Sequence, residues 1–307
     1  MYDVIIIGGG PAGATAALYT ARGHLSTLVL DKAPNTGALA LTHKIANYPG
    51  VAEELSGKEL LDRIRGQARG FGAEFKQTTI TAVDLEGESK LVFTADGMFE
   101  AKAVIVATGS KGRNRMLPGE EKLLGSGVST CATCDGAFFE GKEIAVIGDS
   151  EEALDEVLAL NKLVSKIHFV VPRNELQGAE TLPPLDKTEL YFRTRPLEIV
   201  GEHHVEGLRV KAPNGEEQQL QVDGVFVFLS GSKPGTDFLQ DQVPLDENGF
   251  MILDESMQSP VPGVFGAGEV RRSPVKQAVV AAADGAIAAM AVDKFIHRRA
   301  QLIPQYK

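Results

Sequence analysis

The sequence has few cysteines, no long apolar run and no excess of basic residues, and each absence excludes a class of protein. The only two cysteines of the 307 residues are Cys131 and Cys134, too few for a disulfide framework. No apolar run reaches the roughly 18 residues that a membrane-spanning helix needs, and the start MYDVIIIGGG lacks the basic segment of a signal peptide. A net charge of −10 would repel a phosphate backbone, so we expect no nucleic-acid partner. With no apolar run for a membrane and one cysteine pair suited to a reducing compartment, we expect a cytoplasmic protein that does not bind membranes.

The two cysteines form one CxxC, a spacing that zinc sites and redox dithiols share. A zinc site normally has four ligands, and no second pair of Cys or His lies at a useful spacing. We therefore predict no metal and a redox-active dithiol. Asp135 directly follows Cys134, and a carboxyl group beside a dithiol can move the proton that thiol–disulfide exchange requires.

The segment DVIIIGGGPAGATAALYTARG (3–23) predicts a dinucleotide site. A buried-type strand turns through glycines into an alanine-rich helix, where Gly8 permits the tight turn, Gly10 lets the backbone approach a pyrophosphate and Gly13 lets helix and strand lie close. The N-terminal amides of the helix can then bind the phosphates. A second strand (26–31) ends on Asp31, which is placed to accept hydrogen bonds from a ribose.

Later segments add to the same site. AKAVIVATGS (101–110) is an apolar strand that ends in a glycine turn, and PGVFGAGEV (262–270) delivers Gly268 and Glu269 to another turn. A long helix rich in small residues follows over 276–296. Since both ends of the chain build one nucleotide site, the middle of the chain should be an inserted domain.

The ordered set of motifs resembles the low-molecular-weight thioredoxin reductases over essentially the whole chain. These motifs are GGGPAG, ANYPG (46–50), VIVATGS, CATCDG, GVFGAGEV and QAVVAAADG. The resemblance implies an α/β fold of two Rossmann-like, three-layer ββα domains and a homodimer. The FAD-binding domain would comprise 1–112 and 244–307, with an inserted pyridine-nucleotide-type domain over 113–243 that carries the CxxC.

The resemblance also implies roles for single residues. Cys134 would lie against the flavin and exchange electrons with it, Cys131 would attack the partner disulfide, and Asp135 would donate the proton. The chain departs from the family where NTGAL (35–39) lacks a glutamine and where glutamate replaces the aspartate beside the ribitol chain. The positions expected to contact FAD are Gly8, Gly10, Pro11, Ala12, Gly13, Asp31, Gly37, Leu39, Asn47, Val83, Thr108, Gly109, Gly268, Glu269, Gln277, Ala278 and Val279. In the tail LIPQYK, Tyr306 would either stack on an exposed isoalloxazine ring or belong to a frayed surface segment.

The inserted domain has a second turn, IGDSEEA (147–153), whose composition is unfavourable for a phosphate. Aligned with the first turn, it has Ser150 in place of Gly10, so a side chain occupies the path of the pyrophosphate. The turn also carries Asp149, Glu151 and Glu152. Each like-charge contact would cost on the order of 1 kcal/mol, which together weakens binding roughly a hundredfold or more. The same side chains also suit a helix cap, which would itself occupy the amides that phosphates use.

A second anion-binding device is reduced in the segment PRNELQ (172–177). The family usually clasps the 2′-phosphate of NADPH with several arginines after this strand, whereas only Arg173 remains here, with Pro172 and Gln177 at other arginine positions. We therefore predict a degenerate nucleotide site.

Three functions follow as hypotheses. The first is an FAD-dependent disulfide oxidoreductase that reduces a thioredoxin-like protein and takes electrons from ferredoxin or another reduced flavin, as in the family members that lack NADPH motifs. The second is an NADPH-dependent thioredoxin reductase with a weakened site. The third is a flavin redox sensor without turnover.

Overall fold

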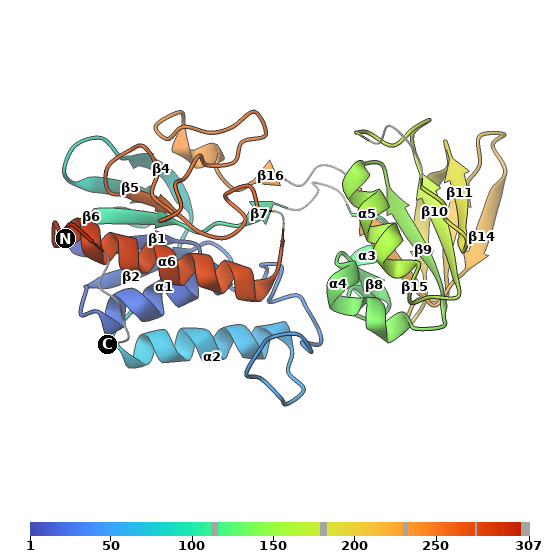
Figure 1. Cartoon of the computed structure of the whole chain (residues 1–307), viewed down its shortest axis with the longest axis horizontal. Helices are drawn as coiled ribbons and strands as arrows, with labels where there is room; N and C mark the ends of the chain where they lie inside the picture. Colours follow the sequence, from blue (N-terminus) through green and yellow to red (C-terminus); the bar gives the residue numbers. More distant parts are fainter. Residues whose placement is uncertain (112–115, 179–182, 230–232, 274, 302–307) are drawn as a thin grey trace. The chain divides into compact units, whose positions relative to one another are not determined.

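The computed structural model describes residues 1–111, 116–178, 183–229, 233–273 and 275–301, which divide into two compact units (Figure 1). Unit 1 combines Met1–Thr42, Tyr48–Lys111 and Lys233–Lys307, and unit 2 combines His43–Asn47 with Gly112–Ser232. Both units are Rossmann-like, with parallel sheets in a mixed α/β fold, so the predicted fold class is confirmed. No helix in the described ranges is long and apolar enough to cross a membrane.

Unit 1 is built on a sheet in the order β3-β2-β1-β6-β5-β4, with β17 also paired to β6. Its strands are β1 (Tyr2–Ile7), β2 (Thr27–Asp31), β3 (Glu74–Gln77), β4 (Ile80–Asp84), β5 (Lys90–Thr94), β6 (Gly97–Val106) and β17 (Val264–Gly266). β1, β2, β3, β6 and β17 run parallel, so their carboxyl ends meet at one edge of the sheet. A ligand site is expected at that edge.

Three helices, α1 (Pro11–Arg22), α2 (Gly57–Gly70) and α6 (Ala278–Ile296), form a layer beside the sheet in Figure 1. Small residues let α1 and α6 pack closely, because a Cβ on Gly285 would meet the Ala12 carbonyl oxygen at 2.1 Å. A second core cluster of unit 1 joins apolar side chains of β1, β2, β4, β5 and β6 with Leu239 and Val243.

The chain returns to unit 1 at Lys233 rather than at residue 244. The short strands β7 (Ser110–Lys111) and β16 (Lys233–Pro234) pair antiparallel, and the 3₁₀ helix η2 (Asp237–Leu239) follows. Leu239 and Val243 are buried in the core of unit 1. These apolar side chains explain why 233–243 belongs with unit 1, although the proline-containing sequence after it is typical of a boundary.

Unit 2 contains a parallel sheet in the order β11-β10-β9-β15-β8. Its strands are β8 (Val128–Ser129), β9 (Glu143–Gly148), β10 (Lys166–Val171), β11 (Thr188–Phe192) and β15 (Gly224–Phe228). The helical segments are α3 (Glu120–Leu123), α4 (Ala132–Asp135), η1 (Gly136–Phe139) and α5 (Glu151–Leu160).

The predicted β meander over 197–231 is only partly correct. A separate antiparallel sheet contains β12 (Arg195–Val200), β13 (Gly207–Lys211) and β14 (Glu217–Gln221), with the PNGE turn between the last two. β15 leaves this sheet and pairs with β8 and β9. Its residues are apolar and buried on both faces, as a central parallel strand requires.

Candidate functional site

The turn between β1 and α1 is shaped by its glycines as the sequence predicts. Gly8 has a φ of +101°, and a Cβ on Gly13 would lie only 1.9 Å from the Gly8 carbonyl oxygen. Gly10 is the N-cap of α1 and has nothing within 4 Å of where a Cβ would stand. No side chain caps this helix start, so its amides face open space that suits a pyrophosphate.

Asp31 and Arg65 brace the same turn from the side. One carboxylate oxygen of Asp31 accepts from the Gly9 amide at 2.9 Å, and the other accepts from the Ala33 amide at 3.0 Å. Arg65, which is only 4% exposed, donates from Nε and Nη2 to the Gly9 carbonyl oxygen at 2.9 and 2.7 Å. Its Nη2 also lies 3.5 Å from Asp31. Sequence reasoning missed Arg65, because its contacts lie far away in the chain.

The ends of β6 and β17 bring further predicted residues to this edge. A Cβ on Gly8 would contact Ala107 and Thr108, and a Cβ on Gly268 would stand 3.1 Å from Ala12. Glu269 accepts a short hydrogen bond from Ser110. This contact holds the longer acidic side chain that replaces the family's aspartate.

An ion pair within unit 1 supports the turn that carries Glu269. Arg271 donates to both carboxylate oxygens of the buried Asp284 at 2.8 and 2.7 Å, and Asp284 also accepts from the Gly268 amide at 3.2 Å. The turn is therefore fixed from α6.

The remaining predicted flavin positions are distributed over several elements. Pro11 and Ala12 open α1, Gln277 is the N-cap of α6, and Ala278 and Val279 begin that helix, which no side-chain bond caps. Gly37 and Leu39 lie in the loop after β2, with Leu39 buried. Thr108 donates to the Gly235 carbonyl oxygen at 2.8 Å, and Gly109 accepts from the Gly235 amide at the same distance.

The last three predicted positions are Val83, Asn47 and Tyr306. Val83 is buried, and its carbonyl oxygen accepts from Gln242 at 2.6 Å. Asn47 belongs to the segment 43–47 that clusters with unit 2. Tyr306 lies outside the described residues. All three stay predictions.

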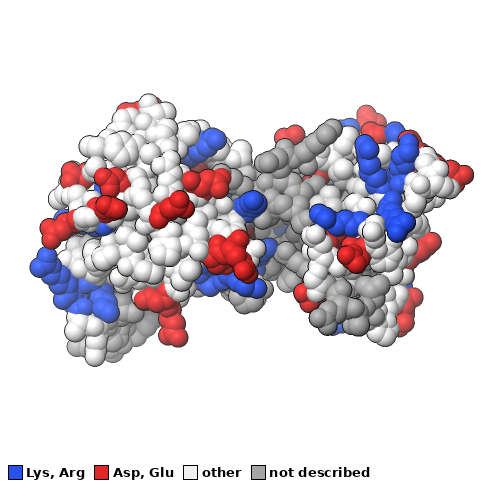
Figure 2. Space-filling model, turned by 90° about the horizontal axis from the view of Figure 1, so that it is seen from above, with Lys and Arg blue, Asp and Glu red and all other residues white. Residues whose placement is uncertain are grey.

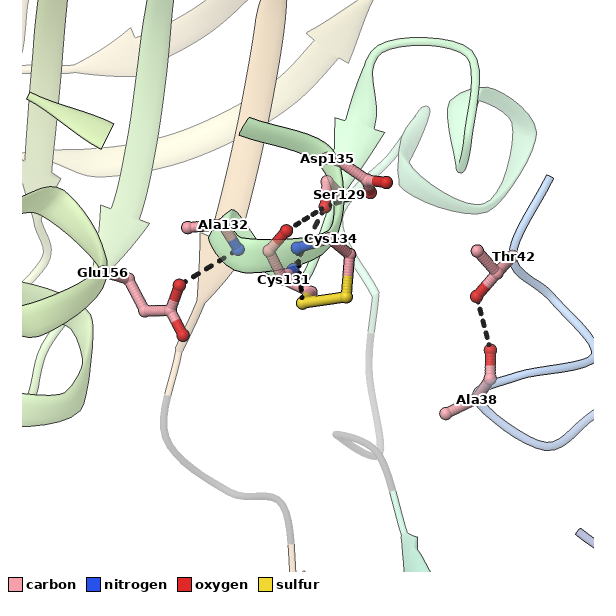
Figure 3. The surroundings of a disulfide bond; sticks show 8 residues. All are labelled: Ala38, Thr42, Ser129, Cys131, Ala132, Cys134, Asp135 and Glu156. Atoms are coloured by element: carbon pink, nitrogen blue, oxygen red, sulfur yellow. Dashed lines mark hydrogen bonds between the residues drawn. A yellow bond between two sulfur atoms is a disulfide. The ribbon is translucent and has the colours of Figure 1, made fainter. Parts of the chain in front are cut away.

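The dithiol lies in unit 2, where Cys131 and Cys134 form a disulfide with their Cα atoms 5.3 Å apart (Figure 3). Cys131 is the N-cap of the short helix α4, and its Sγ accepts from the Cys134 amide at 3.1 Å. That amide can stabilise a thiolate on Cys131 once the disulfide is reduced.

Asp135 connects to this pair through Ser129. Ser129 Oγ lies 2.6 Å from Asp135 Oδ2, accepts from the Cys131 amide at 3.1 Å and donates to the Cys131 carbonyl oxygen at 3.3 Å. Burial raises the pKa of Asp135, although the Ser129 hydrogen bond opposes that shift. Ser129 Oγ donates to Asp135 Oδ2 and also accepts from the Cys131 amide, so the hydroxyl connects the carboxyl group to the dithiol.

Glu156, on α5, makes a second contact to the dithiol segment that the sequence did not suggest. Its Oε2 accepts from the Ala132 amide at 3.0 Å, directly after Cys131 (Figure 3). A carboxylate thus stands beside the redox pair.

The turn between β9 and α5 is filled by the chain itself, in contrast to the turn of unit 1. Ser150 is the N-cap of α5, and its hydroxyl accepts from the Ala153 amide at 3.4 Å. The Glu151 amide donates to the Gln177 carbonyl oxygen at 2.8 Å, and the Gln177 amide donates to Asp149 at 2.9 Å. Residue 177 therefore forms a β-bridge with Ser150 across the turn.

The one remaining arginine of this region is also engaged. Arg173 Nε donates to Asp149 Oδ2 at 3.0 Å. The Asp149 side chain is 8% exposed, whereas that of Arg173 is 51% exposed. If Arg173 turned to a phosphate, the buried carboxylate would lose this partner, which is unfavourable.

Comparisons with known proteins agree with this geometry. The model of the family described as pyridine nucleotide-disulphide oxidoreductase matches residues 2–285. A thioredoxin reductase of Aquifex aeolicus is 48% identical over 100% of this chain and 97% of its own length. A thioredoxin reductase structure from Streptococcus pyogenes matches with a TM-score of 0.92 at 34% identity, over 97% of this chain and 99% of that one. One from Gloeobacter violaceus matches with a TM-score of 0.60 at 47% identity, over 100% and 97%.

Proposed function

Because the chain belongs to the pyridine nucleotide-disulphide oxidoreductases and is thioredoxin reductase-like, we propose that it reduces a thioredoxin with electrons from a donor other than NADPH. The chain is a flavin-dependent disulfide oxidoreductase, and FAD is its cofactor. We also carry over the homodimer of the family as part of the proposal.

Unit 1 would hold FAD at the edge of its sheet. The turn at Gly10 and the first amides of α1 would bind the pyrophosphate, and Asp31, oriented by the Gly9 amide, would accept from the ribose. Glu269, held by Ser110, would hold the ribitol chain. When bound, FAD supplies the two-electron chemistry that connects the donor to the dithiol.

Unit 2 would carry the electrons onward through Cys131 and Cys134. The Cys131 thiolate attacks the thioredoxin disulfide and forms a mixed disulfide, and Cys134 then closes the bond to Cys131 and releases thioredoxin as a dithiol. Asp135 donates the proton that the leaving thiolate takes up, and its raised pKa keeps that proton available.

The charge of the chain suits a protein partner better than nucleic acid. The net charge is −10. On the face shown in Figure 2, small groups of acidic side chains alternate with small groups of basic side chains. Nucleic-acid binding proteins instead gather basic residues on one face.

The observation that carries the proposal about the donor is the turn before α5. Its amides at Glu151 and Ala153 already have partners within the chain, and Arg173 pairs with Asp149. A dinucleotide phosphate would have to displace these contacts, at a turn whose sequence carries three acidic residues. Ferredoxin or a second reduced flavin protein needs none of these groups.

The NADPH-dependent function remains the second candidate, and the comparisons favour it at least equally. The matching relatives include ordinary thioredoxin reductases, and the family model is that of pyridine nucleotide enzymes. The structure of α5 also retains Ala153 packed against Gly148, as a nucleotide-binding turn requires.

Photoreduction tests electron transfer independently of the donor. The FAD-loaded protein is photoreduced without oxygen, an oxidised thioredoxin is added, and the thiols of thioredoxin are counted. We expect reduced thioredoxin from the parent protein and none from Cys134→Ser. Failure of the parent to reduce any thioredoxin would instead support the redox sensor, and full transfer by the variant would disprove the assigned route.

A further inference from the structure

Glu156 connects the helix of the second nucleotide-type turn with the dithiol. It lies on α5 and accepts from the Ala132 amide, the first residue of α4 (Figure 3). Ala132 is 3% exposed and Glu156 is half-buried, so this hydrogen bond is partly shielded from water. Charges that are shielded in this way interact more strongly than charges on an open surface.

The contact has two electrostatic effects on Cys131. The negative charge of Glu156 stands next to the residue that would carry a thiolate, which disfavours that thiolate. The same carboxylate also occupies the Ala132 amide, which could otherwise turn its positive end toward the sulfur. The amide of Cys134, which donates to Cys131 Sγ at 3.1 Å, acts in the opposite direction. The Cys134 amide and the Glu156 carboxylate thus act on the Cys131 thiolate in opposite directions, and Asp135, connected through Ser129, is the other ionisable group described at this pair.

We propose that Glu156 is a positioning residue that restrains thiolate formation on Cys131 and thereby keeps the dithiol strongly reducing. A dithiol becomes more oxidising when its reduced form is stabilised as a thiolate. Destabilising that thiolate favours the reaction in which the dithiol loses two electrons and its protons while the thioredoxin disulfide gains them. This inference rests on the proposed function only in taking Cys131 as the attacking cysteine.

Alkylation of a single thiol tests the effect directly. In FAD-loaded Cys134→Ser protein, the rate at which iodoacetamide modifies Cys131 is measured against pH. Adding Glu156→Gln removes the charge and keeps a hydrogen-bond acceptor. The midpoint of the curve of alkylation rate against pH should therefore fall by about one pH unit, and at pH values below both midpoints the variant should hold about tenfold more thiolate. Glu156→Ala should lower the midpoint at least as far. Asp155→Asn, an exposed neighbour on the same helix, is the matched control and should leave it unchanged.

The intact dithiol provides a second readout that a purely structural role would not change. The protein is equilibrated with dithiothreitol redox buffers, and its thiols are counted after acid quenching. The reduction potentials of the dithiol in Glu156→Gln and in the parent should agree at low pH. Toward high pH the potential of Glu156→Gln should become the higher of the two, by about 30 mV for a tenfold change in the equilibrium constant. Equal potentials at every pH, or an unchanged or raised alkylation midpoint in Glu156→Gln, would overturn the proposal.

Neither measurement uses thioredoxin or an electron donor. Loss of the Glu156 effect would leave the proposed function standing, whereas absence of thioredoxin reduction would leave the alkylation result intact. A lowered melting temperature in Glu156→Ala with no shift of the midpoint in Glu156→Gln would mean that the residue only stabilises the fold, and would also contradict the inference.

Discussion

Asp135 shows at the scale of one residue how burial prepares a carboxyl group for proton transfer. Its pKa is raised by burial, so the folded protein retains the proton to a higher pH than an ordinary aspartate does. An acid of this kind favours the folded state fully at low pH and loses that contribution as pH rises through its raised pKa. Asp135 is therefore a group kept for chemistry at some cost in stability at neutral pH.

We predict that Asp135→Asn slows transfer from the dithiol to thioredoxin by about a hundredfold or more. The parent rate should fall as pH rises through the raised pKa of Asp135, because the acid form is the active one, and the variant should lack this decline. Rates of thioredoxin reduction between pH 5 and 9 would test it. The melting temperature of the Asp135→Asn variant at neutral pH should be no lower than that of the parent. Glu140→Gln, exposed in the same segment, is the control, and a parent-like pH profile in Asp135→Asn would refute the role.

Arg65 is the matching case in unit 1, since its two donors hold the carbonyl oxygen of Gly9 in the flavin turn. Leaving a buried acceptor without its donors costs about 1–3 kcal/mol, so Arg65→Met should weaken FAD binding by about tenfold or more. Fluorescence titration of the apoprotein with FAD measures this. Arg65→Lys should restore part of the affinity, and Arg63→Met, which alters an exposed ion pair on the same helix, should leave it unchanged. An unaltered FAD affinity in Arg65→Met would show that the turn holds its shape without this residue.

At the scale of elements, α1 and α5 start from the same strand–turn–helix design and differ in what occupies the turn. Gly10 leaves the start of α1 open, whereas Ser150, Gln177 and Asp149 occupy the start of α5. A cap of this kind stabilises a helix by about 1 kcal/mol. The second turn thus gains local stability from contacts that exclude a phosphate.

Opening the second turn should therefore create or strengthen an NADPH site. In Asp149→Asn/Ser150→Gly, Arg173 loses its charged partner and α5 loses its side-chain cap, so NADPH affinity should rise by about tenfold or more. Isothermal titration with NADPH measures the change. Asp155→Asn removes one negative charge elsewhere on the helix and should have no such effect. If the double variant binds NADPH no better than the parent, these contacts do not control the site.

The sequence predicts elements well where the pattern is local. The strand and glycine turn at 3–23, Asp31 at the end of β2 and the long helix predicted over 276–296, observed as α6, all follow from short-range spacing. Arg65, Ser110 and Glu156 could not be found in this way, because each is an ordinary polar residue whose partner comes from another element. The mutual engagement of Asp149 and Arg173 was likewise hidden, although both residues had been singled out.

At the scale of the whole molecule, the chain consists of two compact units, and the predicted domain bounds differ from theirs chiefly at 233–243. Unit 1 resumes at Lys233, whereas the predicted domain boundary is 244, because the strand pair of β7 and β16 is only two residues long on each side and has no periodic pattern in the sequence. The predicted meander wrongly included β15 for a similar reason: an apolar run such as that of β15 is compatible with either sheet of unit 2.

Two units with separate cores should unfold in separable steps. Bound FAD should stabilise unit 1, so calorimetry should show its melting temperature rise when FAD is added. At a free FAD concentration one hundred times the dissociation constant, the free energy of unfolding of unit 1 should increase by about 2.7 kcal/mol. The transition of unit 2 should move little with FAD, and neither transition should move with NADPH. A rise of the unit 2 transition with NADPH would show that its nucleotide site still functions.

The central claim, that electrons reach the flavin without NADPH, is tested most directly by anaerobic rapid mixing. FAD-loaded protein is mixed with micromolar NADPH, and the flavin absorbance near 450 nm is followed, with dithionite as the reference for complete reduction. The contacts that fill the turn before α5 predict slow and incomplete bleaching with NADPH and full bleaching with dithionite. Prompt and complete bleaching by NADPH would contradict the account and establish an ordinary NADPH-dependent thioredoxin reductase.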